Sequence, residues 1–208
     1  MPTPTQTRRN ALRATLIVIA ERRIAADGLP NLRARDLAVE AGCALGAIYT
    51  VFPDLTALVL EVNARTFADL GQDVAEALAK AALDPAAQMV TMGHAYHRFA
   101  ASNRFRWRAL FDVARPAGTK PPDWYLNAMA RLFAYIADPV SVLFPQMADR
   151  DRALFTRALF SSVHGIVWLA LDAASAGVPE AETDRMIALL LEQLCGKQTL
   201  LEQRSQVN

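Results

Sequence analysis

The stretch RARDLAVEAGCALGAIYTV, residues 33–51, decides the fold that we predict for the first part of the chain. Its periodicity predicts two short helices joined by the turn Ala41-Gly42-Cys43, which is the pattern of a helix-turn-helix. Two helices that cross steeply need a small residue where they touch, and Ala38 supplies it. Gly42 suits the turn because glycine adopts backbone angles that a side chain resists. The solvent side of the second helix is then free to enter a major groove of DNA.

The charge distribution also indicates a nucleic-acid partner. The formal net charge is only +1, but the first 35 residues carry seven arginines against Glu21 and Asp27. A basic first part on a neutral-to-acidic body indicates a polyanion that only this part contacts. Leu45 and Ala47 offer only carbon to a base edge, so they could contact only thymine methyl groups. The candidate DNA-binding residues are Arg8, Arg9, Arg13, Arg33, Arg35, Leu45, Gly46, Ala47, Tyr49 and Thr50.

The composition of the 208 residues favours an all-α protein. The chain is 53% hydrophobic, mostly alanine and leucine, and it has no useful stretch of alternating strand pattern. Residues 1–7 read as a disordered arm, the polar end from Lys197 is expected to fray, and Asp138-Pro139 is expected to break a helix. The expected helices are 8–26, 33–40, 44–51, 54–80, 85–101, 104–114, 122–137, 149–176 and 179–196.

The sequence indicates neither a secreted nor a membrane-spanning protein. Cys43 and Cys195 have no paired spacing, so neither a disulfide framework nor a zinc site is indicated. The apolar stretch 14–20 is too short for a signal peptide and is followed at once by charged residues. No stretch is expected to reach the length of a membrane span. We therefore expect a cytoplasmic protein.

The sequence also lacks the common catalytic and phosphate-binding motifs. It contains no serine elbow, phosphate loop or paired carboxylates, so we do not expect an enzyme, and no cofactor is implied. His94 and His97 lie one helical turn apart and could bind a metal ion. No carboxylate or cysteine is near them in sequence, and the neighbouring Arg98 disfavours a cation, so we expect no metal site.

Residues 16–58 resemble the TetR/AcrR family of transcriptional repressors. The resemblance implies about nine helices, with a helix-turn-helix domain over residues 1–53 and a helical ligand-binding and dimerisation domain over residues 54–208. It also implies that Tyr49 binds a phosphate and that Arg35 is well placed for a phosphate or a guanine. The matching positions are Leu16-Ile17, Ala20, Ile24, Gly28, Leu32, Arg35-Asp36-Leu37-Ala38, Glu40-Ala41-Gly42, Gly46-Ala47-Ile48-Tyr49, Phe52 and Leu58.

Two positions depart from the family pattern. Ala44 stands where a serine or threonine usually caps the second helix of the motif, and Leu55 stands where a lysine usually reaches a phosphate. The function that the resemblance implies is a repressor released by a small hydrophobic or aromatic effector. Because of Ala44 and Leu55 a second interpretation stays open, in which the helix-turn-helix has lost specific DNA binding and the chain is a ligand-binding helical dimer.

The second half is similar to the WHG-type regulatory domain of one branch of that family. The similarity lies in residues 95–100, 107–111 and 162–165, with Val163 in place of the tryptophan. It implies that aromatic residues and methionines surround a ligand cavity, although such a stripe can also be plain core. The candidate ligand-binding residues are Met92, Tyr96, Phe99, Trp107, Phe111, Trp124, Tyr125, Met129 and His164.

The last two helices have broad apolar faces that predict a homodimer. Paired with a two-fold copy they would form a four-helix bundle, and a two-fold dimer matches a palindromic operator. The candidate interface residues are Leu159, Val163, Ile166, Ile187, Leu190, Leu191 and Leu194.

Overall fold

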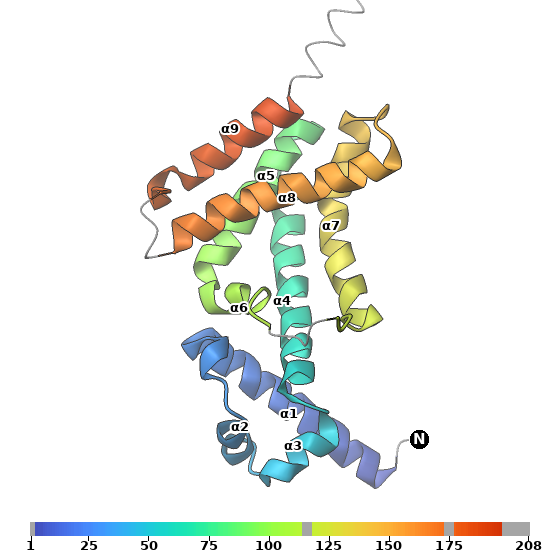
Figure 1. Cartoon of the computed structure of the whole chain (residues 1–208), viewed down its shortest axis with the longest axis vertical. Helices are drawn as coiled ribbons and strands as arrows, with labels where there is room; N and C mark the ends of the chain where they lie inside the picture. The colour runs from blue at the N-terminus through green and yellow to red at the C-terminus, as the bar shows by residue number, and fades with distance from the viewer. Residues whose placement is uncertain (1–2, 114–117, 173–176, 197–208) are drawn as a thin grey trace, which may run out of the picture. The chain divides into compact units, whose positions relative to one another are not determined.

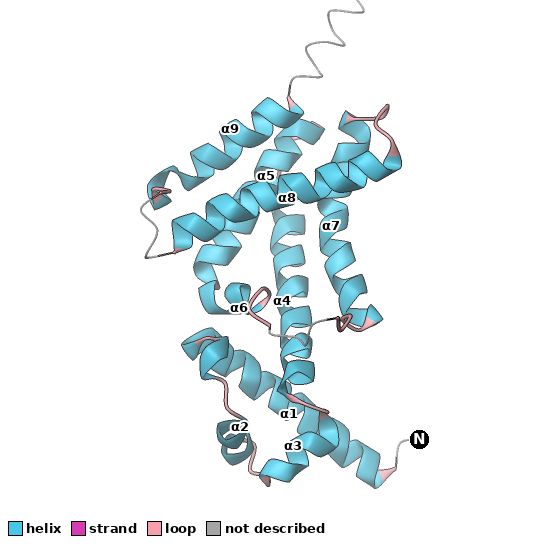
Figure 2. Cartoon of the chain, in the orientation of Figure 1, coloured by secondary structure: helices cyan, strands magenta, loops and turns pink. Residues whose placement is uncertain are grey.

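The computed structural model describes residues 3–113, 118–172 and 177–196, and every regular element within these ranges is helical (Figures 1 and 2). Nine α-helices and two short 3-10 helices lie in the described residues. The predicted all-α fold is therefore confirmed. Packing divides the chain into an amino-terminal unit, residues 1–69 and 103–129, and a carboxy-terminal unit, residues 70–102 and 130–208.

This division differs from the boundary predicted after residue 53. Helix α4 (Leu55–Leu78) belongs to both units, because its first part supplies Leu58, Val59 and Val62 to the core around the helix-turn-helix. The segment 103–129 belongs to the amino-terminal unit although it follows α5 in sequence. Helix α7 (Asp123–Leu143) likewise has residues in both units.

The amino-terminal unit begins with α1 (Pro4–Asp27), which is longer than predicted. The expected disordered arm is wrong from residue 4 onward, because the Thr3 side chain accepts a hydrogen bond from the Gln6 backbone N–H at 3.2 Å and so caps the helix. Pro4 then occupies a first-turn position that suits proline. Gly28, with φ of 79°, ends the helix at the predicted place, and the remaining elements are η1 (Leu29–Asn31), α2 (Ala34–Glu40), α3 (Leu45–Val51) and α6 (Arg104–Ala109).

The carboxy-terminal unit contains α5 (Pro85–Ser102), α8 (Asp149–Leu171), η2 (Glu180–Glu182) and α9 (Thr183–Cys195), with the remaining parts of α4 and α7. The predicted break at Asp138-Pro139 is wrong, since α7 runs through Pro139 to Leu143. A proline removes one backbone hydrogen bond from a helix. Here Val140 is fully buried and Phe144 nearly so, and their packing holds the last turn together.

Helix α8 also differs from the expectation that no stretch could span a membrane. Its 23 residues are long and apolar enough to do so by length and composition, and α3 with α4 passes the same test as a pair bent by 63°. Within the unit, α8 packs against α5 and α9 and buries Leu159, Val163 and Val167.

Helices α5 and α9 approach each other closely at Gly93. A methyl group added to Gly93 would lie 2.5 Å from Ile187 Cγ2 and 3.1 Å from Leu191 Cδ1, two side chains that are fully buried or nearly so. At Gly71, in the part of α4 that belongs to the same unit, the nearest atom is Tyr135 Cε2 at 3.9 Å, which is ordinary contact. The two glycines therefore serve different purposes.

We predict that Gly93→Ala lowers the free energy of unfolding by about 1–2 kcal/mol, because overpacking outweighs the gain in helix propensity. Gly71→Ala is the matched control and is expected to raise this free energy by about 0.5–1 kcal/mol. Urea unfolding followed by circular dichroism measures both. Equal effects of the two substitutions would contradict the close approach of α5 and α9.

Candidate nucleic-acid interface and ligand cavity

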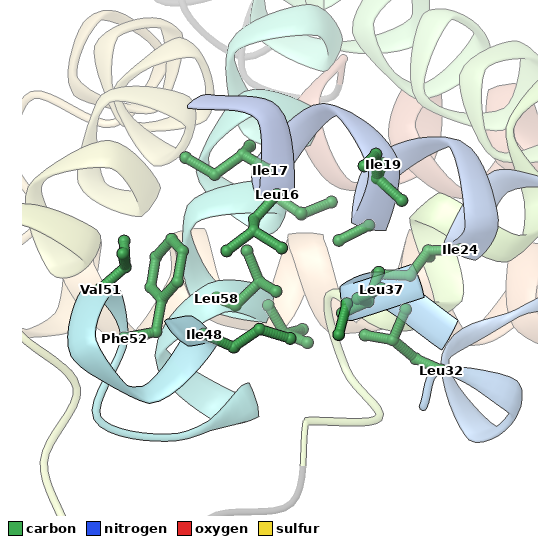
Figure 3. Packing of buried hydrophobic residues seen from close by; sticks show 14 of the residues in the cluster. Leu16, Ile17, Ile19, Ile24, Leu32, Leu37, Ile48, Val51, Phe52 and Leu58 are labelled. Atoms are coloured by element: carbon green, nitrogen blue, oxygen red, sulfur yellow. The ribbon is translucent and has the colours of Figure 1, made fainter. Parts of the chain in front are cut away.

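Helix α3 is held in the amino-terminal unit by its inner side. Ile48 is fully buried and Val51 nearly so, in a cluster with Leu16 of α1, Leu37 of α2 and Leu58 of α4 (Figure 3). The turn between α2 and α3 is fixed by the backbone, where the Cys43 N–H donates to the Ala38 carbonyl at 3.0 Å. Gly42 in this turn has φ of 63°. The predicted helix-turn-helix is thus present.

The outer side of α3 carries the predicted base-reading residues and is almost without free polar groups. Leu45 is 39% exposed and Tyr49 is 50% exposed, while Ala47 is half-buried. The Thr50 hydroxyl donates to the Ala47 carbonyl at 2.7 Å, so its proton is used inside the helix. A partner that approaches this side meets mainly carbon and one phenol.

The five predicted arginines fall into two groups. Arg8, Arg9 and Arg35 are exposed and form no ion pair with any described residue. Arg13 pairs with Glu61 and lies over the Phe52 ring, 5.1 Å from its centroid. Arg33 donates to the Pro30 carbonyl at 2.6 Å. Arg8, Arg9 and Arg35 therefore offer a whole guanidinium to a phosphate, and Arg33 offers the N–H groups that Pro30 leaves free.

A set of ion pairs that sequence reasoning missed ties the motif to its neighbours. Glu40 at the end of α2 pairs with Arg22 and, at 2.8 Å, with Arg23 of α1. Arg106 of α6 lies 2.9 Å from Glu21 of α1 and 2.5 Å from Asp69 of α4. Each pair joins residues that are at least 17 positions apart in sequence, so no local pattern could have revealed it.

The two departures from the family pattern have different structural consequences. Ala44 is the N-cap of α3 and makes no side-chain hydrogen bond to it. Leu55 packs against the core cluster of the amino-terminal unit, so the apolar side chain contributes to burial. Asp54 accepts a hydrogen bond from the Ala57 backbone N–H at 2.7 Å and caps α4.

The carboxy-terminal unit contains an apolar cavity of about 60 Å³. Two of the predicted ligand-binding residues, Met92 and Tyr96, line this cavity. Parts of α4 and α7 also line the cavity, but their lining residues were not predicted because their pattern is that of an ordinary core. Predicted residue Phe99 is buried in the same unit but does not line the cavity, and Trp107, Phe111, Trp124, Tyr125 and Met129 belong to the amino-terminal unit. The cavity is lined by Leu70, Val74, Met89, Met92, Gly93, Tyr96, Leu132, Phe133, Tyr135, Ile136, Leu159, Phe160, Val163 and Leu191.

His164 does not line the cavity, but it contacts the hydroxyl of Tyr96, a side chain that does. Its Nδ1 lies 2.7 Å from the Tyr96 hydroxyl, and its ring stacks on Phe160 with centroids 5.5 Å apart. Burial lowers the pKa of His164, so the neutral ring is favoured. A neutral Nδ1 without a proton accepts from the Tyr96 hydroxyl, and the pair thereby joins α5 to α8.

The other two histidines contact Asp184 of α9. His94 Nε2 lies 3.0 Å from the Asp184 carbonyl oxygen, and His97 Nδ1 lies 2.8 Å from Asp184 Oδ1. Within the described ranges no group of three or more histidine, cysteine, aspartate or glutamate side chains could hold a metal ion. Both histidines thus join α5 to the first turn of α9.

The predicted interface residues differ in how much surface they leave for a partner. Leu159, Val163, Ile187 and Leu191 are buried within the chain, Ile166 and Leu190 are half-buried, and Leu194 is 41% exposed. Neighbouring leucines that were not predicted are more exposed, namely Leu154, Leu169 and Leu189.

Comparison with known proteins relates both the sequence and the fold to transcription regulators. Residues 89–194 match the family described as "Tetracyclin repressor-like, C-terminal domain". Among curated proteins, no relative of this sequence was found.

Solved structures of similar fold cover most of the chain. A protein of unknown function from Rhodococcus sp. RHA1 is 22% identical over 88% of this chain and 95% of its own, with a TM-score of 0.69. RolR in complex with its ligand resorcinol is 22% identical over 91% of this chain and 90% of its own, with a TM-score of 0.67. A putative TetR family transcription regulator from Shewanella sp. PV-4 is 16% identical over 86% of this chain and 95% of its own, with a TM-score of 0.63.

The two helix caps give a test of the local structure. We predict that Ala44→Ser raises the free energy of unfolding by about 0.5–1 kcal/mol, because serine would accept a hydrogen bond from a free N–H in the first turn of α3. Asp54→Ala is expected to lower this free energy by about 1 kcal/mol, because it removes the observed cap of α4. Chemical unfolding measures both, and an unchanged Asp54→Ala variant would contradict the cap.

Proposed function

The chain belongs to the tetracycline-repressor-like family of transcription regulators, and from that premise we propose that it is a homodimeric, cytoplasmic repressor that a small hydrophobic or aromatic effector releases from a palindromic operator. Its DNA-binding face is the outer side of α3 together with Arg8, Arg9 and Arg35. Its effector site is the apolar cavity of the carboxy-terminal unit. The main support for the proposal is that α3 packs into the unit by its inner side only and leaves its outer side exposed, where it can contact DNA.

Backbone contacts supply most of the DNA affinity in this proposal. Arg35 and Tyr49 border one shallow hollow on the protein surface, which Arg33, Ala34, Asp36 and Leu45 also line. The Asp36 carboxylate there lies 3.8 Å from the Arg23 guanidinium, which offsets its charge. A free guanidinium beside a half-exposed phenol suits a phosphate group, since both donate hydrogen bonds to its oxygens. Arg8 and Arg9, in the first turns of α1, add positive charge that neighbouring phosphates would neutralise.

The cavity supports an effector that is mostly carbon. Its walls come from Leu, Val, Met, Ile and aromatic side chains, which favour a lipophilic or aromatic molecule over a sugar or a nucleotide. The complex of RolR with resorcinol provides an example of an aromatic ligand on the same fold. Benzene occupies a cavity of roughly 150 Å³ in another protein, so a cavity of about 60 Å³ must widen to admit a comparable ring.

That widening is the proposed cause of release. A ligand shifts a conformational equilibrium only when it binds one state better than the other, and a cavity that must open provides this difference. Helices α4 and α7 both line the cavity and both contribute residues to the amino-terminal unit. Displacement of their cavity-lining parts is the proposed route to the DNA-binding face.

The proposed dimer uses α8 and α9. The side chains that remain exposed there include Leu154 and Leu169 of α8 and Leu189 and Leu194 of α9. Burial of four such leucines against a second copy would contribute several kcal/mol, at about 25 cal/mol for each Å² of apolar surface. A two-fold arrangement presents two copies of α3 to the two half-sites of a palindrome.

We predict that Arg35→Gln lowers affinity for selected duplex DNA by about tenfold and lowers the slope of log affinity against log salt by about one, because one phosphate contact is lost. Arg131→Gln, at an exposed arginine on α7, is the matched control and should leave both unchanged. Fluorescence anisotropy at several salt concentrations measures them. A chain that binds no duplex better than unrelated DNA is instead the ligand-binding dimer with a degenerate helix-turn-helix.

We predict that a small aromatic effector raises the melting temperature of the chain and releases its DNA, and that Val74→Phe, which fills the cavity, abolishes both effects while DNA binding persists. Leu83→Phe, at a leucine that is 91% exposed and has no part in the proposed dimer, is the control and should respond like the parent chain. Screening simple phenols by thermal shift, followed by the anisotropy measurement, provides the readouts. Full response of Val74→Phe would place the effector outside this cavity.

A further inference from the structure

We infer that α3 selects its DNA sequence by contact of Leu45 with the 5-methyl groups of thymines, and not by a hydrogen-bond code. This rests on the proposed function, because it assumes that α3 enters a major groove. It goes further by naming the chemical feature of the operator that the helix recognises.

The outer side of α3 has very few hydrogen-bonding side-chain groups. Leu45 and Ala47 have none, and Gly46 has no side chain. The hydroxyl proton of Thr50 is donated to the Ala47 carbonyl, so Thr50 presents its methyl group and oxygen lone pairs. Tyr49 retains a phenol, and the proposed partner of this phenol is a phosphate that Arg35 also contacts, in the hollow that Leu45 lines as well. No amide or charged side chain lies on α3.

Guanine, adenine and cytosine are normally read through hydrogen bonds in the major groove. Guanine is read by arginine or lysine, adenine by asparagine or glutamine, and cytosine by a carboxylate. The seven residues LGAIYTV of α3 include none of these side-chain types. Thymine alone presents a carbon group in the groove, its 5-methyl, and this is the feature that an exposed leucine can recognise.

Gly46 makes such contacts geometrically accessible. A methyl group added there would meet nothing within 4 Å, so packing inside the chain does not require a glycine at this place. A glycine within a helix destabilises the helix relative to alanine. Its presence lets the backbone of α3 come close to the base edges, which brings the first-turn residue Leu45, 39% exposed, within reach of a methyl group.

The experiment first selects duplexes from a random library with the full-length chain. Each thymine of the best duplex is then replaced singly by deoxyuridine, which pairs identically and lacks only the methyl group. We expect at least one thymine per half-site at which affinity falls about fourfold, because a buried CH₂-sized group contributes about 0.8 kcal/mol. At that position a 5-methylcytosine–guanine pair should bind about fourfold tighter than an unmethylated cytosine–guanine pair.

The variant Leu45→Ala links the effect to the side chain. In this variant the ratio of affinities for the thymine and deoxyuridine duplexes should fall to about one, whereas a merely structural role of Leu45 would weaken both duplexes equally. Leu83→Ala removes the same atoms from a leucine that is 91% exposed in the carboxy-terminal unit, and it should preserve the fourfold ratio.

Three outcomes count against the account, and they are distinguishable. Failure to select any duplex above unrelated DNA overturns the proposed function and this inference with it. Selection of a duplex in which no deoxyuridine substitution matters overturns the inference and leaves the proposed function intact. A methyl effect that persists fully in Leu45→Ala overturns the assignment to Leu45.

Discussion

The burial of Ile48 is the constraint on which the rest of the amino-terminal unit depends. A helix of seven residues is too short to be stable by its own hydrogen bonds, so α3 exists because its inner side packs against Leu16, Leu37 and Leu58 (Figure 3). That packing buries one side of the helix. The opposite side is left exposed with no role inside the unit, and this is why a function can be assigned to it.

The same constraint explains why so much of the surrounding structure is ionic. A short helix held on one side needs its neighbours fixed, and the ion pairs of Glu40 with Arg22 and Arg23 fix α2 on α1. Arg106, through Glu21 and Asp69, fixes α6 against α1 and α4. Arg8, Arg9 and Arg35 are exposed and take no part in these ion pairs, so a polyanion can use their charge.

Local signals in the sequence predicted the helices well, and signals that depend on distant residues were missed. Gly28 and Gly42 marked real chain reversals, because a positive φ is a property that glycine shows locally. Pro139 misled, since the burial of Val140 outweighs a missing hydrogen bond only once the unit is packed. The early start of α1 could have been found from Thr3 and Pro4, which form a recognisable cap.

The candidate sites show the same difference between local signals and signals that depend on distant residues. The outer residues of α3 follow from the periodicity of a helix-turn-helix, so sequence alone named them. The candidate ligand-binding residues were predicted from residue type, because they are mostly aromatic residues and methionines. Residue type does not distinguish Tyr96, which lines the cavity, from Trp107, which is fully buried in the other unit. Whether an aromatic side chain borders empty space depends on how the helices assemble.

Hydrogen–deuterium exchange, compared between the free chain and the chain saturated with a selected duplex, shows whether α3 binds DNA. We expect DNA to slow amide exchange in the segment 44–51 and in the first turns of α1, and to leave the exposed segment around Leu83 unaffected. Unchanged exchange in the segment 44–51, with protection confined to other parts of the chain, would contradict the claim that the outer side of α3 is the DNA-binding face.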